Sequence, residues 1–273
     1  MNEIKTYTGE LPQAAFSFSE DKQRTDEWFE NRRGRFTGSR IKDLMTCSRA
    51  SAKLEWGRAE KLLDFGETCK KYIYEKAMER KTGKVVKLQD NLNFKYGRKI
   101  EPIIHEMLLE KYPDYEIEKF GFVEIKGLEG IAGASPDDAF ISRIRKGGVV
   151  YGIEAKAAMN WGTQFERVIE PVDQSQMDFW QLQTEMMALE VNTMLYVTSD
   201  PPHDVLEVLN CEDNERIKEM IGNINVRQVQ ASEIHQDAIR KRCLIGDAII
   251  KEFLKGIPFH DAIRNICTNF KPV

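Results

Sequence analysis

The sequence predicts a mixed α/β fold in which a central sheet is flanked by helices. Apolar residues follow a helical period up to about residue 111, alternate with a period of two between residues 114 and 156, and later return to helical spacing. A chain of 273 residues, of which 41% are hydrophobic and 31% charged, can bury one large core. We therefore expect a single domain whose sheet is built from the middle of the chain.

The N-terminal part of the chain is expected to be helical after a loose arm over residues 1–20. A short helix is predicted over residues 40–45, with a hydroxyl side chain as its N-cap. A longer, charged helix over residues 54–80 should end at the Thr-Gly-Lys sequence that follows it. A third helix is predicted over residues 94–111, where Pro102 should lie near the first turn or bend the helix.

An antiparallel meander of strands is expected between residues 114 and 156. Its members are residues 115–125, 130–135, 138–142 and 149–156. A helix over residues 175–189 should then lead to two further strands, at residues 194–198 and 205–209, which return the chain to the sheet.

The C-terminal part, from Asp213 onward, is predicted to be helical and charged, with breaks at Gly246 and at residues 256–258. We therefore divide the single domain into a core over residues 28–211 and a helical extension over residues 212–273. No internal repeat or low-complexity segment marks a linker between them.

Charge and composition exclude several classes of protein. The net charge of −4 argues against a passive DNA-coating protein, but a nuclease needs basic groups only along one groove and acidic groups at its metal site. Because no apolar stretch approaches the ~20 residues of a membrane span, and no signal peptide is evident, we expect a cytoplasmic protein without a membrane partner. Five scattered cysteines indicate reduced thiols, not a disulfide framework or a zinc site.

Charged residues concentrate in two neighbouring strands of the predicted meander. The sequence Ser135-Pro-Asp137-Asp is followed, after a turn over residues 146–148, by Ile-Glu154-Ala-Lys156. Residues two apart share one face of a strand, so Glu154 and Lys156 should point to the same spot. If the two strands pair, Asp137 brings a second carboxylate there, and such oxygen ligands suit Mg²⁺. A metal at this spot could activate water for phosphodiester hydrolysis, with Lys156 neutralising developing charge.

The alternative interpretation is that these charges form a solvated face. An isolated Glu-x-Lys pair on a strand is usually of that kind. Here, however, Glu154 and Lys156 lie in an otherwise apolar strand over residues 149–156, where solvated charge is less expected. A Pro-Asp sequence lies upstream at the distance expected for the preceding strand of a hairpin, and this second, independent observation favours a metal site.

Asp137 with Glu154-Ala155-Lys156 resembles the PD-(D/E)XK nuclease motif. Three further blocks resemble the lambda-exonuclease and YqaJ-like branch of that superfamily, in the right order between residues 28 and 197. The resemblance implies a restriction-endonuclease-like core, with a central mixed sheet flanked by helices. It also implies that Ala155 contributes its carbonyl oxygen as a metal ligand.

The first block runs from Trp28 through Arg32 to Ser39 and resembles the W-x(3)-R-x-G-x(2)-T-[AG]-S element of the branch. The resemblance implies that Arg32 and Ser39 contact the phosphate at the 5′ end of the degraded strand, and Ser135 matches another phosphate-contacting serine. The residue types fit, because a guanidinium pairs bidentately with phosphate and exposed amides at the start of a helix favour an anion. A solvated basic surface is the alternative.

The second and third blocks lie on predicted helices. Glu101, in Tyr-Gly-x(3)-Glu, resembles a glutamate near the metal site and becomes a further candidate metal or catalytic carboxylate. Gln181 and Gln183 resemble the Q-x-Q helix of the branch; since they do not share a helix face, only one should reach the site, and we favour Gln181. One departure is Asp138, which stands where the branch commonly has glycine.

The resemblance implies a Mg²⁺-dependent exonuclease, which should also accept Mn²⁺, that degrades double-stranded DNA from its ends in the 5′-to-3′ direction. It further implies a role in phage-type recombination in a bacterial host cell, a ring-shaped homotrimer and a single-strand annealing protein as partner. The alternatives are an endonuclease of the same superfamily and an inactive DNA-binding protein with the same fold. An iron–sulfur nuclease is disfavoured by the scattered cysteines, and a small-molecule enzyme by the lack of a glycine-rich phosphate loop.

Overall fold

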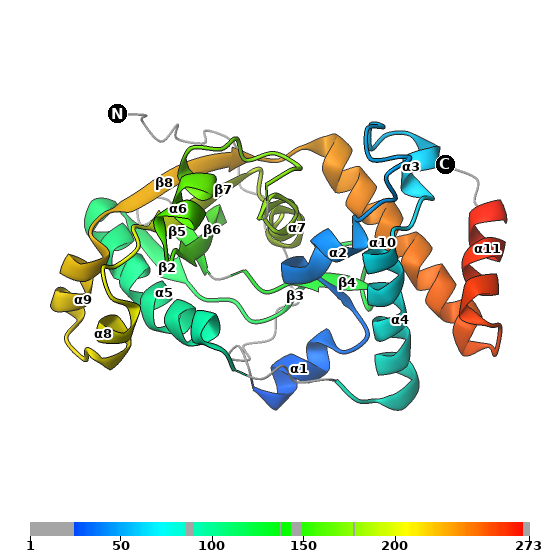
Figure 1. Cartoon of the computed structure of the whole chain (residues 1–273), viewed down its shortest axis with the longest axis horizontal. Helices are drawn as coiled ribbons and strands as arrows, with labels where there is room; N and C mark the ends of the chain where they lie inside the picture. The colour runs from blue at the N-terminus through cyan, green and yellow to red at the C-terminus, as the bar shows by residue number, and fades with distance from the viewer. Residues whose placement is uncertain (1–24, 86–89, 137, 143–148, 177, 270–273) are drawn as a thin grey trace.

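The computed structural model describes residues 25–85, 90–136, 138–142, 149–176 and 178–269 (Figure 1). The helices are α1 (Asp26–Arg32), the 3-10 helix η1 (Gly38–Arg40), α2 (Ile41–Leu44), α3 (Ala59–Leu62), α4 (Glu67–Thr82), α5 (Leu92–Lys111), α6 (Trp161–Val168), α7 (Phe179–Leu189), α8 (Val205–Asn210), α9 (Asn214–Ile221), α10 (Glu233–Leu254) and α11 (Phe259–Asn269). The strands are β1 (Phe36–Thr37), β2 (Tyr115–Glu118), β3 (Val123–Glu124), β4 (Ala132–Ala134), β5 (Asp138–Ser142), β6 (Val149–Ala157), β7 (Thr193–Ser199) and β8 (Ile224–Gln230).

The strands form two sheets. The larger has the order β2-β5-β6-β7-β8, in which only the pairing of β6 with β7 is parallel. The smaller has the order β1-β4-β3, with β1 parallel to β4. The predicted mixed α/β fold with a central mixed sheet is therefore confirmed.

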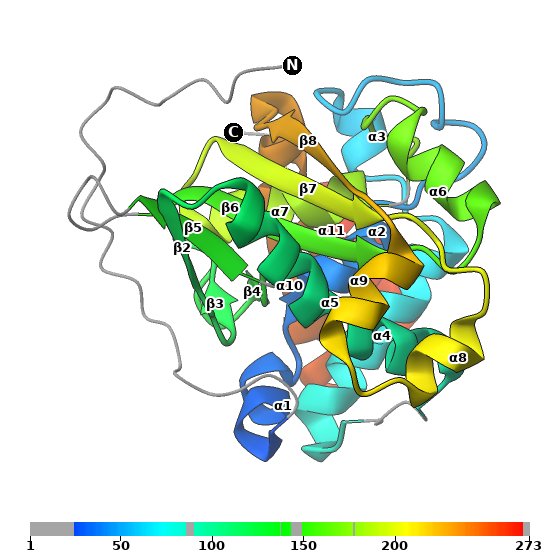
Figure 2. The same ribbon diagram turned by 90° about the vertical axis from the view of Figure 1, so that its left-hand side faces the viewer.

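Helices cover both faces of the larger sheet, so that side chains from alternate strand positions enter two separate cores. Ile153 and Ala155 of β6, with Leu195 of β7, pack in a cluster with α5, α8 and α9. Met194 and Tyr196, the neighbouring positions of β7, pack in a cluster with α7 instead. Figure 2 shows α5 crossing in front of the sheet. By strand alternation, Glu154 and Lys156 lie on the face towards α7.

Several predictions about strands were wrong. The meander is divided, because β3 and β4 leave β2, β5 and β6 to pair in the smaller sheet with β1. Residues 205–209 form helix α8, whose N-terminal amides receive a cap from the side chain of Asp204. The C-terminal extension is not wholly helical, because β8 pairs along β7 as the edge strand of the larger sheet.

The helix predictions were right in position but wrong in several boundaries. Residues 54–80 form α3 and the separate α4, although α4 does end at Gly83, which has φ 68°. No hydroxyl caps α2, whose N-cap is Arg40. Pro102 lies in the middle of α5 and not in its first turn. The predicted helix 175–189 begins at Phe179, and α1 and α6 were not predicted.

Gly246 does not break a helix. It lies inside α10, where a Cβ atom would come within 2.7 Å of the Phe36 ring, so it lets α10 approach β1 closely. The break at residues 256–258 is confirmed, since α10 ends before Gly256, which has φ 98°. Among the described helices, none combines the length and apolar character that crossing a bilayer requires. The described cysteines, Cys47, Cys69, Cys211, Cys243 and Cys267, are all free thiols.

Candidate active site

The predicted charged pair of β6 forms one cluster with helix α7. The ammonium of Lys156 donates to the Oε1 atom of Glu154, whose side chain is completely buried. Gln181 of α7 joins both residues: its Nε2 atom donates to Glu154 Oε1 at 2.7 Å, and its Oε1 atom lies 3.4 Å from Lys156 Nζ. Glu154, Lys156 and Gln181 therefore occupy one place in the fold, as their positions in the sequence led us to expect.

A second buried carboxylate, not identified from the sequence, belongs to the same cluster. Glu185 lies one turn after Gln181 on α7 and is only 1% exposed. The Nε2 atom of Gln181 donates to Glu185 Oε1 at 2.8 Å. The cluster thus holds two carboxylates, one amide and one ammonium on the face of β6 towards α7.

The start of α7 is tied to the sheet by a buried polar network. Asp178, the N-cap residue, accepts a 2.5 Å hydrogen bond from the phenol of Tyr196 on β7. It also forms an ion pair with Arg167 of α6, with 3.3 Å between Nε and Oδ2. Burial raises the pKa of Tyr196, so the phenol keeps its proton and acts as a donor. Because Tyr196 pairs in register with Glu154, this network fixes α7, and with it Gln181, against β6.

The residues predicted to bind phosphate form a second cluster. Arg32, at the end of α1, donates from Nη1 to the hydroxyl of Ser135 at 3.0 Å and from Nη2 to the hydroxyl of Ser39 at 3.1 Å. The indole of Trp28 also donates to Ser135, at 3.0 Å. The guanidinium of Arg32 lies 4.1 Å from the centre of the Trp28 ring. Segments far apart in the sequence therefore meet around one guanidinium.

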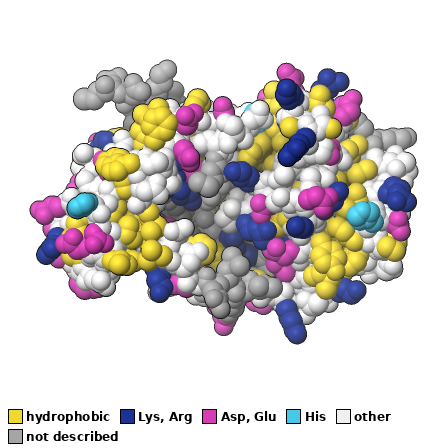
Figure 3. Space-filling model, in the orientation of Figure 1, with side chains coloured by type: hydrophobic (Ala, Val, Ile, Leu, Met, Phe, Trp, Pro, Cys, Tyr) yellow, Lys and Arg dark blue, Asp and Glu magenta, His cyan; other side chains and the backbone are white. Residues whose placement is uncertain are grey.

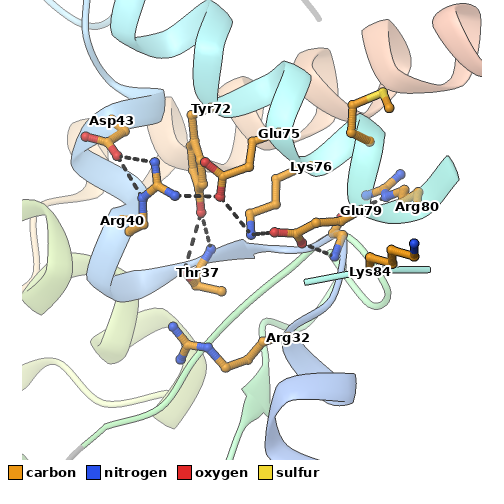
Figure 4. Close-up of polar contacts among 12 residues, drawn as sticks. Arg32, Thr37, Arg40, Asp43, Tyr72, Glu75, Lys76, Glu79, Arg80 and Lys84 are labelled. Atoms are coloured by element: carbon orange, nitrogen blue, oxygen red, sulfur yellow. Dashed lines mark hydrogen bonds and ion pairs between the residues drawn. The ribbon is translucent and has the colours of Figure 1, made fainter. Parts of the chain in front are cut away.

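A network on α4 supports the chain that presents Arg32 and Ser39 (Figure 4). The amide of Thr37 donates to the phenol of Tyr72 at 3.0 Å, and the amide of Gly34 donates to Glu79 at 2.7 Å. Lys76 pairs with Glu79 at 2.8 Å, although both side chains are buried. Paired and hydrogen-bonded in this way, the buried charges hold residues 34–37 against α4.

The same surroundings act on Arg32 itself. Burial lowers the pKa of its guanidinium to about 10, against the opposing influence of Tyr72 and Glu79. Arg32 therefore keeps its charge at neutral pH, but in partly dehydrated surroundings where an anion would be held more strongly than in water. Figure 4 shows its guanidinium lying apart from the carboxylates of Glu75 and Glu79.

A short piece of chain connects the two clusters. Ser135 accepts from Arg32, and Asp138, three residues later, pairs in β5 with Ile153, the neighbour of Glu154. Three residues of extended chain span at most about 11 Å, and neighbouring strands lie about 4.8 Å apart. Helix α7 also contacts both regions, because Gln181 faces Glu154 while Thr184 lies beside Gly38.

In Figure 1, α2, β4 and α7 lie near the middle of the molecule, with β6 to their left and α1 below them. Figure 3 shows several Lys and Arg side chains near the centre of this face, with Asp and Glu side chains among them. A pocket of about 340 Å³ is lined by residues of α2, of α6 and of the segment before α7, among them Asp178, which bonds to Tyr196. Its lining includes the basic residues Lys42 and Arg167 and the acidic residues Glu166, Glu170 and Asp178.

Several predicted ligands lie outside these clusters or outside the described residues. Asp137, the first predicted metal ligand, is outside the described residues, as are the turn over residues 146–148 and the N-terminal arm. Glu101 lies half-buried on α5, which packs against β6. Its role, and that of the Ala155 carbonyl, stay predictions. Within the described ranges, no three carboxylate, imidazole or thiol side chains are grouped to hold a metal ion.

Gln183 belongs to another part of the molecule. Its amide donates to the backbone carbonyl of Gln230 at 3.0 Å and accepts from the amide of Ser232 at 2.8 Å, so it ties α7 to the segment after β8. Of the two glutamines, only Gln181 contacts the described Glu154 cluster. Their different directions follow from their spacing, because residues two apart on a helix point about 160° away from each other.

Solved structures share this architecture. An alkaline exonuclease, LHK-Exo, from Laribacter hongkongensis matches with a TM-score of 0.61 and 19% identity over 87% of this chain and 98% of its own. The same enzyme in complex with dAMP matches with a TM-score of 0.61 and 18% identity. A phage-related exonuclease from Haemophilus somnus matches with a TM-score of 0.59 and 14% identity over 82% of this chain and 96% of its own.

The chain has the fold of these exonucleases. The resemblance to the lambda-exonuclease branch, first seen in short motifs, is thereby confirmed for the fold over most of the chain. Neither a family model nor a curated protein matches the sequence. At such low identity, the comparison shows the fold alone, and the chemistry of the two clusters has to be argued from the residues themselves.

Sequence reasoning missed the residues that support the clusters from other elements. Glu185 could have been found, because it lies four residues after Gln181 and so shares its helix face. A glutamate between Thr184 and Met186, in an otherwise apolar stretch, is a second signal. Tyr72 and Glu79 offered no comparable signal, since their contacts depend on how α4 packs against residues 34–37.

Proposed function

We propose that this protein is a Mg²⁺-dependent exonuclease that hydrolyses double-stranded DNA from its ends, in the 5′-to-3′ direction. One observation carries the proposal: Ser135, which accepts from Arg32, lies three residues before Asp138, and Asp138 pairs with Ile153, the neighbour of Glu154 in the buried Glu154–Lys156–Gln181 cluster. A terminal phosphate held by the first cluster would place a nearby phosphodiester at the second. The shared fold with known exonucleases supports the same conclusion.

We propose that the site binds a hard divalent metal ion. Among the described residues, Glu154 offers a buried carboxylate on β6, and oxygen donors are what Mg²⁺ and Mn²⁺ prefer. Glu154, with Asp137, Glu101 and the Ala155 carbonyl, would hold the metal. When bound, such a metal would polarise a phosphodiester and lower the pKa of a water molecule.

The remaining chemistry falls to Lys156 and Gln181. The ammonium of Lys156 adjoins Glu154 and can neutralise charge that develops on the phosphate during hydrolysis. Gln181 contacts both residues and can orient them or a water molecule near them. Replacing Lys156 by methionine keeps an unbranched side chain of similar length but removes its charge. We expect kcat to fall by about a hundredfold or more, the loss typical of one electrostatic group at a reacting centre.

The Arg32 cluster supports an exonuclease over an endonuclease. A guanidinium held by two serine hydroxyls and stacked on Trp28 offers charge-assisted donors to a phosphate. A terminal phosphate monoester carries more negative charge than an internal diester, so a dehydrated guanidinium favours the end of a strand. Anchoring that end with a 5′-phosphate would set the polarity.

The test is digestion of linear duplex labelled at one end, with and without a 5′-phosphate, in the presence and absence of Mg²⁺. We expect Mg²⁺-dependent release of short products and faster degradation of the phosphorylated strand. Arg32→Gln should remove the preference for the phosphate and retain slow hydrolysis, whereas Lys156→Met should abolish hydrolysis of both substrates. Arg33→Gln is the matched control, because Arg33 is the next residue but pairs with exposed Glu30.

Three results would contradict the proposal. Rapid cutting of covalently closed circular DNA would identify an endonuclease. DNA binding without hydrolysis by the wild-type protein would identify an inactive DNA-binding protein with this fold. Equal activity of the wild type and Lys156→Met would show that the Glu154 cluster is not the active site. We further propose a recombination role with a single-strand annealing partner and a homotrimeric assembly, which sedimentation of the free protein and co-purification with such a partner can test.

A further inference from the structure

Glu185 is a buried charge that the helix does not need for packing. Its neighbours Met186 and Ala188 are buried and apolar, and α7 lies against the core along most of its length. Leucine would fill such a position more favourably, because a buried carboxylate loses hydration that apolar surroundings do not replace. The carboxylate is therefore better explained by what it contacts, which is the Nε2 atom of Gln181.

The contacts of Gln181 define which way its amide points. A primary amide has only two N–H donors. One is directed to Glu154 Oε1 at 2.7 Å and the other to Glu185 Oε1 at 2.8 Å. The carbonyl oxygen is thereby turned towards Lys156 Nζ, at 3.4 Å. The opposite orientation would set the amide oxygen against two carboxylate oxygens and turn its N–H groups towards the ammonium.

The two carboxylates play unequal parts in this arrangement. Glu154 is the proposed metal ligand, and a carboxylate oxygen engaged by a metal is a weaker acceptor for Gln181. Glu185 lies on the same face of α7 as Gln181, one helical turn away, so the helix itself holds the two side chains next to each other. It can keep one N–H of Gln181 in place whatever Glu154 binds.

We propose that Glu185 is a positioning residue for the hydrolysis: it holds the amide of Gln181 in one orientation, so that the amide oxygen keeps Lys156 aligned. The inference rests on the proposed nuclease function for its catalytic consequence. The proposed role makes Glu185 a functional residue of α7 and explains why a carboxylate is buried at this position.

A double-mutant cycle tests the catalytic consequence. Glu185→Leu removes the acceptor, and Glu185→Gln keeps an acceptor without charge. On linear duplex with Mg²⁺, we expect kcat to fall about tenfold in Glu185→Leu and by a smaller factor in Glu185→Gln, with KM changed less than twofold. In a Gln181→Leu background, Glu185→Leu should change kcat less than twofold, because the group it positions is already absent. An equal loss in both backgrounds would overturn the proposal.

Thr184→Val is the matched control. Thr184 is the neighbouring buried residue of α7, and its hydroxyl donates only to the helix carbonyl of Trp180, at 2.7 Å. Valine keeps the methyl group that lies beside Gly38, so the replacement alters the same helix without changing Gln181 or the contact with Gly38, and kcat should stay within twofold of wild type. A loss like that of Glu185→Leu would mean that any change in α7 impairs the site, and the positioning role would be refuted.

A second readout does not depend on activity. In protein labelled with ¹⁵N-glutamine, the side-chain amide signal of Gln181 is assigned by its loss in Gln181→Leu. Glu185→Leu should shift that signal and speed its proton exchange, and Thr184→Val should leave it unchanged. An unchanged Gln181 signal in Glu185→Leu overturns the inference. If the wild type fails to cleave DNA, the nuclease proposal falls by itself, while this signal still decides whether Glu185 orients Gln181.

Discussion

Replacing Arg32 by lysine should make the preference for a 5′-phosphate depend on pH. Burial lowers the pKa of the Arg32 guanidinium from 12.5 to about 10. The same surroundings would lower the pKa of a lysine, ordinarily ~10.4, to ~8. For a cation this shift means that the charge, and with it the attraction for phosphate, is present at low pH and is lost as pH rises. Lysine at position 32 should therefore lose its charge in a range where arginine keeps it.

The size of the effect follows from these two pKa values. A group with a pKa of ~8 is about three-quarters charged at pH 7.5 and about one-tenth charged at pH 9, which is a change of about eightfold. A group with a pKa of about 10 loses only about a tenth of its charge over this range. Since kcat/KM reports the ionisation of the free enzyme, it is the quantity to compare.

The assay measures kcat/KM for linear duplex with a 5′-phosphate and with a 5′-hydroxyl, at several pH values from 7.5 to 9. The ratio of the two removes the effects of pH on the hydrolytic step, which both substrates share. We expect a nearly constant ratio for wild type and for Arg33→Lys, and a ratio that falls about eightfold for Arg32→Lys. A constant ratio in Arg32→Lys would refute the reasoning, because the side chain would then be neither dehydrated nor responsible for the preference.

Two further predictions concern stability. Arg242→Met should reduce the free energy of unfolding by about 3–5 kcal/mol, because the fully buried guanidinium donates to the carbonyls of Leu44, Lys61 and Asp64, which would be left unpaired. Calorimetry should show a clear loss in Tm. A loss no larger than that of Arg240→Met, a change at a more exposed arginine, would contradict this prediction. Burial lowers the pKa of His235 below 6.5, so the unfolded chain takes up the proton first and stability should fall as pH drops below that value. Urea unfolding at pH 8 and 5.5 should show that His235→Gln lacks this part of the loss, and an identical pH dependence in both proteins would refute the assignment.

Regular periodicity made the central elements predictable. The alternation of residues 149–156 gave both the extent of β6 and the face on which Glu154 and Lys156 lie, because the two-residue period of a strand fixes direction as well as structure. Helix α5 and strand β7 were predicted for the same reason. Where a regular hydrophobic pattern extends over many residues, contacts with neighbouring elements rarely change the secondary structure that it predicts.

The element boundaries and strands that were predicted wrongly depend on contacts between segments distant in the sequence. A Cβ atom at Gly66 would lie 2.9 Å from the carbonyl oxygen of Cys47, so the end of α3 and the start of α4 are set by a close approach that local sequence does not show. Strand β8 lies between two helices and owes its conformation to pairing with β7. In α8, the side chain of Asp204 caps the N-terminal amides and so favours a helix, although the apolar residues of the segment also suit a strand.

The candidate site shows the same division. The sequence indicated Arg32, Ser39 and Ser135 only through resemblance, because nothing local brings residues more than a hundred positions apart to one guanidinium. Helix geometry indicated that only one of Gln181 and Gln183 could reach the site, and we favoured Gln181; the contacts of both residues agree with that expectation. The contact of Glu185 with Gln181 became clear only from the structure, because it depends on how α7 is rotated about its axis relative to β6.

Helix α7 connects the Arg32 cluster with the Glu154 cluster, which we propose act on one DNA strand. Gln181 and Glu185 face Glu154, whereas Thr184 lies beside Gly38, next to the anchor serine Ser39. The N-terminus of α7 is in turn tied to the sheet through Asp178 and Tyr196. The separation of the two clusters is therefore set by a buried helix, not by a surface loop. If the proposed function is right, a terminal phosphate bound by Arg32 would be held at one end of this helix and the hydrolytic groups at the other, which would favour removal of short pieces from an end over internal cutting.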